Sequence, residues 1–492
     1  MRKFYITTSI MYTNGPAHVG FAMELIQADV IARYRRLAGD DVFFLSGTDE
    51  HGSTVARAAA KNKIESQTFV DSIAKQVKDL AKKLNISNND FIRTSDQKRH
   101  WPSAVKLWQL LADKGDLYKK KYKGLYCVGH ESFVKKGDLV DGLCPLHKTQ
   151  PEEIEEENWF FKLSNYKKEI KTKIESDEIK IVPASRKSEI LNVVEDAEDI
   201  SVSRPTSALT WGIPVPGDPG QRIWVWLDAL PNYISALGYA QGDARFKKFW
   251  PADVHLVGKD IVRFHALIWP AILLSAGLEL PRSIYVHGFI TVDGQKMSKT
   301  IGNIIDPLEL VKKYGVDPVR YFLLREIASG EDGDFSYKKL EERYNGDLAN
   351  GLGNLIQRIA TLIENNLGGE LIYKEVESKK LKVESGKYEK AIEEFRLHDA
   401  LGEIWKLVIE ANKYVDDRKP WAEAKESPER FLETLAVLVG FIHNISWLLQ
   451  PFLPETAQKI AEVFGDDLSS KEIPENYKFL IKKSEGLFPR LN

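Results

Sequence analysis

The sequence predicts an α/β protein whose parallel, Rossmann-type sheet is split by an insertion and followed by an all-helical bundle. Three observations predict it: a strand–helix–strand pattern opens the chain, the same alternation returns near residue 253, and long helical patterns replace it from about residue 341. The 492 residues suffice for about two to four domains of 100–200 residues each. The apolar fraction of 43% is ample for their cores.

The first half of the sheet is predicted at the N-terminus. Residues 3–10 alternate in the manner of a strand, and Val42–Leu45 form an apolar run typical of a strand buried on both faces. Between them apolar residues recur at steps of three and four, which predicts one helix face made of Ala22, Leu25, Ile26, Val30, Tyr34 and Leu37. Strands joined by such a helix are parallel.

The second half of the sheet is predicted from strands at 253–257 and 283–290 around a helix at 260–276. We therefore expect five regions: 1–112, the first catalytic half; 113–225, an inserted connective domain; 226–284, the second half; 285–340, a loop and stem-contact region; and 341–492, a helical bundle. Within that bundle, helices are predicted at 388–415, 428–449 and 452–464.

Composition excludes several classes of protein. Two cysteines exclude a disulfide framework, and the chain opens without a leader pattern, so we expect a cytoplasmic protein. The most apolar stretch, Leu435–Ile442, is far shorter than the roughly 20 residues of a membrane span, so we expect no membrane partner. The net charge of −2 excludes nucleic-acid binding through bulk basicity. Residues 341–492 hold 21 of the 69 basic and 27 of the 71 acidic residues, so residues 1–340 hold 48 basic and 44 acidic residues.

Two segments carry the chemistry of an ATP site. The first strand leads into a turn that places His18 and Gly20 at a helix start, where backbone N–H groups suit phosphate. After the second half-sheet, Lys296 and Lys299 follow a predicted turn at Asp293-Gly294, and two such lysines can neutralise a leaving pyrophosphate. Taken singly, each segment is more typical of an ordinary surface loop than of a catalytic one. Neither Gly258-Lys259 nor Gly351–Gly353 completes a P-loop or a dinucleotide fingerprint.

Together these segments resemble the HIGH and KMSKS signatures of class I aminoacyl-tRNA synthetases, with Phe21 and Thr300 at the last position of each. Thr300 keeps a hydroxyl, whereas Phe21 cannot donate a hydrogen bond as histidine does. Three further segments, 48–52, 224–230 and 258–265, resemble the methionyl-tRNA synthetases. The resemblance implies catalytic roles for His18, Gly20, Phe21, Lys296 and Lys299, and ATP contacts from His18, Gly20, Gly258, Lys259, Asp260, Lys296 and Lys299.

An amino-acid site is predicted beside the ATP site. Asp49 follows a buried strand at the carboxyl edge of the sheet, where it could hold a substrate ammonium, although a turn aspartate is the alternative. Aromatic faces suit a thioether, and an aromatic stripe that is plain core is the alternative. With Asp49, the resemblance implies a methionine pocket made of Ile10, Tyr12, Trp226, Ala229, Tyr233, Ile261, Phe264, His265 and Trp269.

Both cysteines belong to C-x-x-H pairs, Cys127 with His130 and Cys144 with His147. This Cys₂His₂ set has the spacing of a zinc knuckle and predicts one structural Zn²⁺, with unconnected core cysteines as the alternative. In the bundle, Asn354 and Arg358 lie one turn apart and Trp421 follows Pro420 at a helix start. The resemblance implies that these three bind the anticodon, although Trp421 could instead dock two helices.

The resemblance implies a methionyl-tRNA synthetase activity: methionyl-adenylate forms from L-methionine and ATP with Mg²⁺, and the acyl group passes to tRNA(Met), including the initiator. Two alternatives stay open, a ligase with a non-tRNA acceptor and a catalytically impaired paralogue that only binds tRNA. ATP–pyrophosphate exchange driven by methionine separates them. Because about 70 residues follow Trp421, we expect no further C-terminal domain and a monomer.

Overall fold

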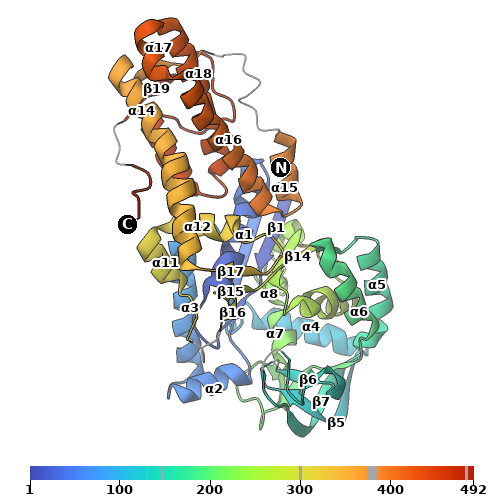
Figure 1. Ribbon diagram of the computed structural model, residues 1–492. Coiled ribbons are helices and arrows are strands. Elements are labelled where there is room, and N and C mark those ends of the chain that lie inside the picture. Colours follow the sequence, from blue (N-terminus) through green and yellow to red (C-terminus); the bar gives the residue numbers. More distant parts are fainter. Residues whose placement is uncertain (130, 146–147, 298–301, 375–384, 483–485, 492) are drawn as a thin grey trace. The chain divides into compact units, whose positions relative to one another are not determined.

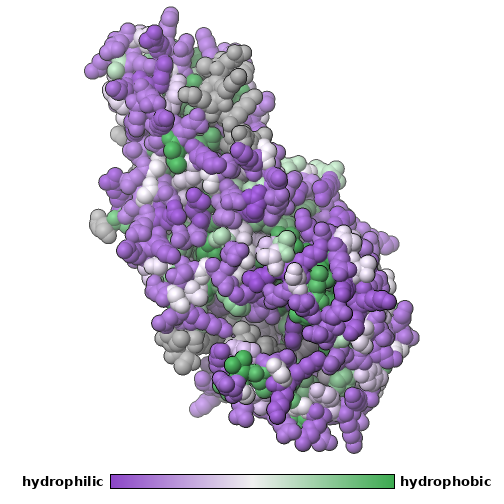
Figure 2. Space-filling view, turned by 45° about the vertical axis from the view of Figure 1, so that its right-hand side comes forward, coloured by the Kyte–Doolittle hydropathy of each residue, from purple (hydrophilic) through white to green (hydrophobic). Residues whose placement is uncertain are grey.

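The computed structural model describes residues 1–491 except 130, 146–147, 298–301, 375–384 and 483–485 (Figure 1). The chain divides into two compact units. Unit 1 comprises residues 1–28, 35–82 and 87–287, and unit 2 comprises residues 29–34, 83–86 and 288–492. Hydrophilic residues cover most of the face shown in Figure 2, and apolar side chains appear there only in small groups.

Unit 1 is built on a seven-stranded sheet in the order β2-β3-β1-β13-β14-β8, with β4 paired to β3. Every pairing in this sheet is parallel. Its strands are β1 (Lys3–Thr8), β2 (Met11–Tyr12), β3 (Asp41–Asp49), β4 (Asp90–Arg93), β8 (Lys180–Val182), β13 (Val254–Gly258) and β14 (Ser283–His287). The predicted split parallel sheet is confirmed, and its carboxyl ends place the functional residues.

Helices of unit 1 connect these strands. Five of them are α1 (Val19–Leu37), α2 (Ser53–Lys61), α3 (Ser66–Lys83), α4 (Trp101–Asp113) and α10 (Trp269–Ser275). Short helices α7 (Val225–Ala229), α8 (Asn232–Ser235) and α9 (Ala244–Phe249) follow the insertion. The helix predicted at 260–276 is not α-helical throughout. A π-helical turn at Phe264–Ile268 precedes α10.

The insertion has its own antiparallel sheet in the order β6-β5-β7-β9. Its strands are β5 (Leu117–Cys127), β6 (Ser132–Val134), β7 (Glu152–Phe161) and β9 (Ile200–Ser201). The lysines of β5 face the glutamates of β7, as in the pair Lys123–Glu153 at 3.1 Å. A second sheet follows, with β10 (Ser203–Pro205), β11 (Pro214–Val215) and β12 (Asp218–Ile223), and two helices, α5 (Lys167–Glu175) and α6 (Lys187–Glu195), complete this part.

Unit 2 begins with the small sheet β16-β15-β17 and continues almost entirely in helices. The strands are β15 (Ile290–Val292), β16 (Gln295–Lys296) and β17 (Gly333–Phe335); β18 (Glu370–Ile372) pairs with β19 (Lys478–Leu480). The helices are α11 (Pro307–Tyr314), α12 (Val316–Arg325), α13 (Tyr337–Arg343), a π-helix (Tyr344–Gly353), α14 (Asn354–Leu367), α15 (Ser385–Glu393), α16 (Leu397–Arg418), α17 (Pro420–Glu426), α18 (Pro428–Leu449) and α19 (Pro454–Phe464).

The helical bundle is confirmed, with one correction. The predicted helix 388–415 is two helices, α15 and α16, because Phe395 adopts a left-handed φ of 58° that interrupts the helical hydrogen bonds. Among the described residues, α18 alone is long and apolar enough to cross a bilayer, and 72% of its most apolar window is buried inside the protein. The central helix of a bundle has this composition because it packs on all sides.

One buried arginine holds distant segments of unit 2 together. Arg320 is fully buried and donates to the Asp29 carboxylate at 2.8 Å, and to backbone oxygens of Leu84, Pro451 and Phe452. Because its charge is paired and its guanidinium donates four hydrogen bonds, its burial is compensated. Residues 29–34 and 83–86 therefore belong to unit 2 although they are far from it in sequence.

Candidate functional site

The start of α1 carries the first predicted catalytic residues. His18 is exposed, and its Nδ1 accepts a hydrogen bond of 3.1 Å from the backbone N–H of Gly20. A neutral His18 in this arrangement carries its proton on Nε2, where it can donate to a phosphate oxygen. Phe21, by contrast, is only 7% exposed and belongs to the buried core. The two residues of the motif therefore lie in opposite environments.

Asp49 lies at the end of β3 with its carboxylate 6% exposed. Its Oδ1 has no hydrogen-bond partner among the described residues, while the backbone N–H of His51 donates to the carboxylate. Burial, and then the charges of Asp228, Glu131 and Glu50, raise the pKa of Asp49 well above its ordinary value. A buried carboxylate that is surrounded by negative charge and has one oxygen without a partner among the described residues is suited to receive an ammonium group.

Two buried histidines share one carboxylate beneath this position. His51 Nδ1 donates to Asp228 Oδ2 at 2.6 Å, and His100 Nε2 donates to Asp228 Oδ1 at 3.1 Å. Burial opposes ionisation of Asp228. The charges of both histidines, together with their hydrogen bonds to the carboxylate, nevertheless lower its pKa. Asp228 lies on α7, next to Ala229, so this network connects the loop after β3 with the predicted pocket.

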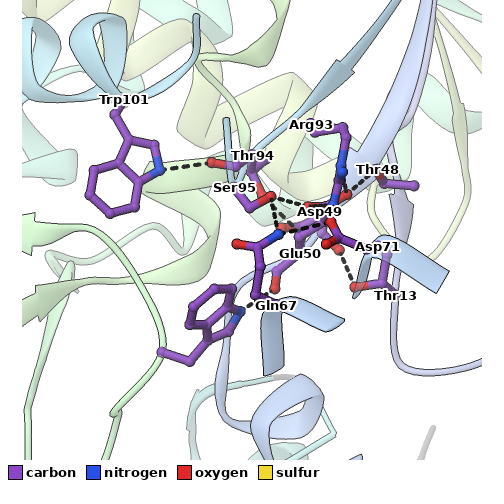
Figure 3. Close-up of polar contacts among 11 residues, drawn as sticks. Thr13, Thr48, Asp49, Glu50, Gln67, Asp71, Arg93, Thr94, Ser95 and Trp101 are labelled. Carbon is purple, nitrogen blue, oxygen red and sulfur yellow. Dashed lines mark hydrogen bonds and ion pairs between the residues drawn. The ribbon is translucent and has the colours of Figure 1, made fainter. Parts of the chain in front are cut away.

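Glu50 forms a second network, shown in Figure 3, that sequence reasoning missed. Its carboxylate accepts two hydrogen bonds from Arg93, at 2.7 and 2.9 Å, and others from Thr48 and Ser95. Its backbone N–H donates to Thr94. These contacts fix the residue that follows Asp49, so they hold the Asp49 backbone in place. A fully buried glutamate requires a partner, but the burial of Glu50 is a property of the fold and has no signal in the sequence.

The predicted methionine-pocket residues come together in unit 1. Trp226 stacks on Phe264 with centroids 3.6 Å apart and an interplanar angle of 5°. The Tyr233 hydroxyl donates to His265 Nε2 at 2.7 Å, because the Nδ1 of His265 faces the Ile261 carbonyl at 3.0 Å. Burial lowers the pKa of His265 to about 4, so its ring is neutral at pH 7. The Trp269 indole N–H is buried and has no partner among the described residues.

The other predicted pocket residues belong to the same cluster. Ala229 is buried, whereas Ile10, Tyr12, Trp226 and Ile261 are partly buried and pack against the shared core. An apolar wall with one carboxylate and a few polar tips has the composition of a small-molecule site.

Gly258 ends β13, and Lys259 and Asp260 follow it, at the same edge of the sheet as Asp49. A Cβ at Gly258 would lie 2.8 Å from Asp260 Oδ1, so a larger residue there would displace the Asp260 side chain from its observed position. The backbone N–H of Lys259 donates to the His287 carbonyl at 3.1 Å. His287 also contacts Glu24 of α1 at 2.9 Å, and Glu24 accepts from the backbone and hydroxyl of Ser9. Sequence reasoning missed Glu24 and His287.

Lys296 belongs to unit 2, in the hairpin of β15 and β16. The predicted turn is confirmed, with φ of 49° at Asp293 and 75° at Gly294. Asp334 accepts from the Gly294 N–H at 2.7 Å and from Thr291 at 2.6 Å, which fixes the hairpin. Lys296 is exposed. Lys299 and Thr300 lie outside the described residues.

The cysteines of the predicted metal site are both buried and form no disulfide. Cys127 ends β5, and Cys144 lies between β6 and β7, where its N–H donates to the Thr149 carbonyl at 2.9 Å. The other two predicted ligands, His130 and His147, lie outside the described residues. Within the described part of the chain, no group of three or more His, Cys, Asp or Glu side chains is placed to hold a metal ion.

The predicted anticodon residues lie together in unit 2. Asn354 and Arg358 are on the first turns of α14, and the guanidinium of Arg358 lies 5.7 Å from the ring centre of Trp421. Trp421 is 47% exposed, which is unusual for a large aromatic side chain. Arg358 also pairs with Asp416 at 2.8 Å. This exposure argues against the alternative in which Trp421 docks two helices.

Comparison with known proteins places these features in a family. A family model described as class I tRNA synthetases (M) matches residues 4–151 and 134–360, and one for the anticodon-binding domain of methionyl tRNA ligase matches 368–485. Methionine–tRNA ligase of Caldanaerobacter subterraneus is 44% identical over 100% of this chain and 79% of its own length; that of Thermotoga maritima is 41% identical over 100% and 80%. Mycobacterium tuberculosis methionyl-tRNA synthetase in complex with methionyl-adenylate superposes with a TM-score of 0.93, at 37% identity and full coverage of both chains.

Proposed function

Because this chain belongs to the class I methionyl-tRNA synthetase family, we propose that it activates L-methionine with ATP and transfers the methionyl group to tRNA(Met), including the initiator. The observation that carries the proposal is the buried Asp49 carboxylate, whose Oδ1 lacks a partner in the described structure. It lies at the same sheet edge as a cluster of aromatic side chains. An ammonium group would pair with the carboxylate while a thioether side chain packs against the rings.

In the first step a methionine carboxylate oxygen attacks the α-phosphorus of ATP, and the bond to the bridging oxygen breaks to release pyrophosphate. The exposed His18 imidazole donates from Nε2 to the phosphate, and the start of α1 adds backbone N–H groups. Lys296 and Lys299 stabilise charge on the leaving pyrophosphate, and Mg²⁺ accompanies the triphosphate as a neutralising ion. Gly258, Lys259 and Asp260 are proposed to contact the nucleotide.

In the second step the 2′-hydroxyl of the terminal adenosine attacks the methionyl carbonyl, and AMP leaves. Asn354, Arg358 and Trp421 are proposed to bind the anticodon in unit 2. An exposed indole next to a guanidinium provides stacking faces for unpaired bases, each worth about 1–3 kcal/mol. Although residues 341–492 have a net negative charge, they can bind tRNA through these three side chains if flanking lysines meet the phosphates.

The test of this function is ATP–pyrophosphate exchange driven by each of the twenty amino acids, followed by charging of tRNA(Met). We expect exchange with methionine and charging that depends on tRNA(Met). Exchange with methionine but charging of no tRNA would indicate a ligase with another acceptor. Exchange with no amino acid would leave only a tRNA-binding protein.

We also propose that the insertion holds one structural Zn²⁺ through Cys127, His130, Cys144 and His147. The two described ligands fit because both thiols are buried in one small segment, where thiolates with imidazoles favour tetrahedral zinc. The ion would fix the loop after β5 and take no part in adenylation. Metal analysis should find about one zinc per chain, lost in Cys127→Ser; zinc-free purified protein would contradict the site.

We further propose that the protein is a monomer in the cytoplasm. The mass of the protein in solution tests the oligomeric state.

A further inference from the structure

Glu131 differs from the glutamates of β7 in the same insertion. The glutamates of β7 are mostly exposed, as is the Glu153 side chain at 65%. Glu131, in the tight turn between β5 and β6, is only 4% exposed. Its φ of 49° and the hydrogen bond from its N–H to the Val128 carbonyl direct the residue inward. A carboxylate buried at the tip of a hairpin requires partners from outside that hairpin.

Those partners come from three other segments of unit 1. Glu131 Oε1 accepts from the Tyr12 hydroxyl at 2.8 Å, from the backbone N–H of Thr54 at 2.5 Å and from the Ser53 hydroxyl at 3.1 Å. The Glu131 carbonyl accepts from the Trp224 indole at 2.6 Å. One residue of the insertion therefore contacts β2, the start of α2 and the residue that precedes α7.

Each of these segments carries part of the amino-acid site. Tyr12 is a proposed pocket wall, α2 begins four residues after Asp49, and α7 carries Ala229. Gly52 shows how closely they pack, because a Cβ there would clash with both the Tyr12 hydroxyl and the Glu131 carboxylate. The negative charge at the first turn of α2 is also favourable, since it pairs with unsatisfied N–H groups of the helix.

We propose that Glu131 is a positioning residue for the amino-acid substrate: it fixes the Tyr12 ring and the loop between Asp49 and α2, so that the insertion shapes the methionine site directly. This inference rests on the proposed function. Glu131 is not proposed to contact the substrate. Glu131 acts on methionine binding through Tyr12 and through the first turn of α2.

The test is a double-mutant cycle of Glu131→Gln and Tyr12→Phe, measured by methionine-driven ATP–pyrophosphate exchange. Gln keeps the shape but loses the charge, and Phe keeps the ring but loses the donor. We expect each single variant to raise the KM for methionine about tenfold, with the KM for ATP changed less than twofold. The double variant should raise the KM for methionine no more than the more damaging single variant does, because both substitutions weaken the same Tyr12–Glu131 hydrogen bond: Gln keeps only a neutral amide acceptor, and Phe has no donor. Glu153→Gln, an exposed carboxylate of the same insertion, is the matched control.

An unchanged KM for methionine in Glu131→Gln would overturn the inference. So would parallel losses toward methionine and ATP with a lowered melting temperature, since these indicate a purely structural role. If Glu131→Gln does not fold, Tyr12→Phe alone decides, because it removes the same hydrogen bond from the pocket side. Absence of methionine-driven exchange in the unmodified chain would contradict the proposed function instead.

Discussion

The proposed amino-acid site of unit 1 and the proposed anticodon site of unit 2 use similar residues in opposite environments. Asp49 is 6% exposed and Trp226 stacks on a buried phenylalanine, whereas Trp421 is 47% exposed beside Arg358. In the buried site a single charge acts strongly but costs stability while no ligand is bound. The exposed site costs little to maintain and gains its binding energy by stacking on a large partner. A small substrate therefore needs a preformed buried site, and a tRNA does not.

The largest expected effect is that of Asp49→Asn. Loss of the charge should lower kcat/KM for methionine in pyrophosphate exchange by about 10-fold to 150-fold, because a charged hydrogen bond contributes about 1.5–3 kcal/mol. The same substitution should raise the melting temperature, since it removes a buried carboxylate whose Oδ1 lacks a partner in the described structure. Asp41→Asn, at the other end of β3, is the control. Normal exchange in Asp49→Asn would exclude Asp49 from the substrate site.

The lysines near the β15–β16 hairpin should affect rate rather than binding. Lys299→Ala should slow adenylate formation by about 100-fold, as expected when one group stabilising transition-state charge is removed, and Lys296→Ala by less. Rapid-quench measurement of adenylate formation, with methionine affinity measured separately, distinguishes the two quantities. Lys313→Ala, an exposed lysine of the same unit, should leave both unchanged. If Lys299→Ala weakened methionine binding instead, the loop would belong to the amino-acid site.

Trp421→Ala should impair the proposed anticodon site and leave the proposed amino-acid site unaffected. Charging of tRNA(Met) should fall about 10-fold to 100-fold, from the loss of one stacking face, while methionine-driven exchange stays unchanged. Ile409→Ala removes another exposed apolar side chain of unit 2, at 65% exposure, and should affect neither assay. Equal loss of charging and exchange in Trp421→Ala would show that the indole supports the fold.

The smallest expected effect is the pH dependence of methionine binding. Burial first, and nearby carboxylates second, raise the pKa of Asp49 in the free enzyme above its ordinary 3.8, whereas a bound ammonium would favour the ionised form. Binding should therefore release a proton, and affinity should rise with pH, by at most about tenfold per unit, until pH exceeds that pKa. His265, with a pKa of about 4, should add no step between pH 6 and 8. Calorimetry in two buffers of different ionisation enthalpy measures the released proton; none released would contradict a raised pKa.

The raised pKa of Asp49 also makes folding stability depend on pH, but stability falls with rising pH whereas methionine affinity rises. A raised pKa in the folded state means that Asp49 holds its proton more tightly when folded. Its contribution to stability is therefore complete below the unfolded pKa and is lost as pH rises through the folded one. In Asp49→Asn this part of the pH dependence of unfolding should disappear.

Local signals located much of the fold and the site. The Asp293-Gly294 turn, the sheet strands and the helix at 428–449 follow from residues close together in sequence. Phe395, whose left-handed backbone separates α15 from α16, had no such signal, because apolar periodicity continues across it. Glu50, Glu131 and His287 were missed for a related reason. A buried polar residue resembles a surface one in sequence until its partner is known.

The sequence by itself determined which chemistry the chain carries and at which edge of the sheet it lies, because strand and helix periodicity and short motifs depend on neighbouring residues. Only the tertiary structure decided which charges are paired. Asp228 joins two histidines from distant segments, and Glu131 reaches Tyr12 across 119 positions. Asp49, in contrast, keeps an oxygen without a partner in the described structure. Burial makes such pairing obligatory, and burial is a property of the folded chain.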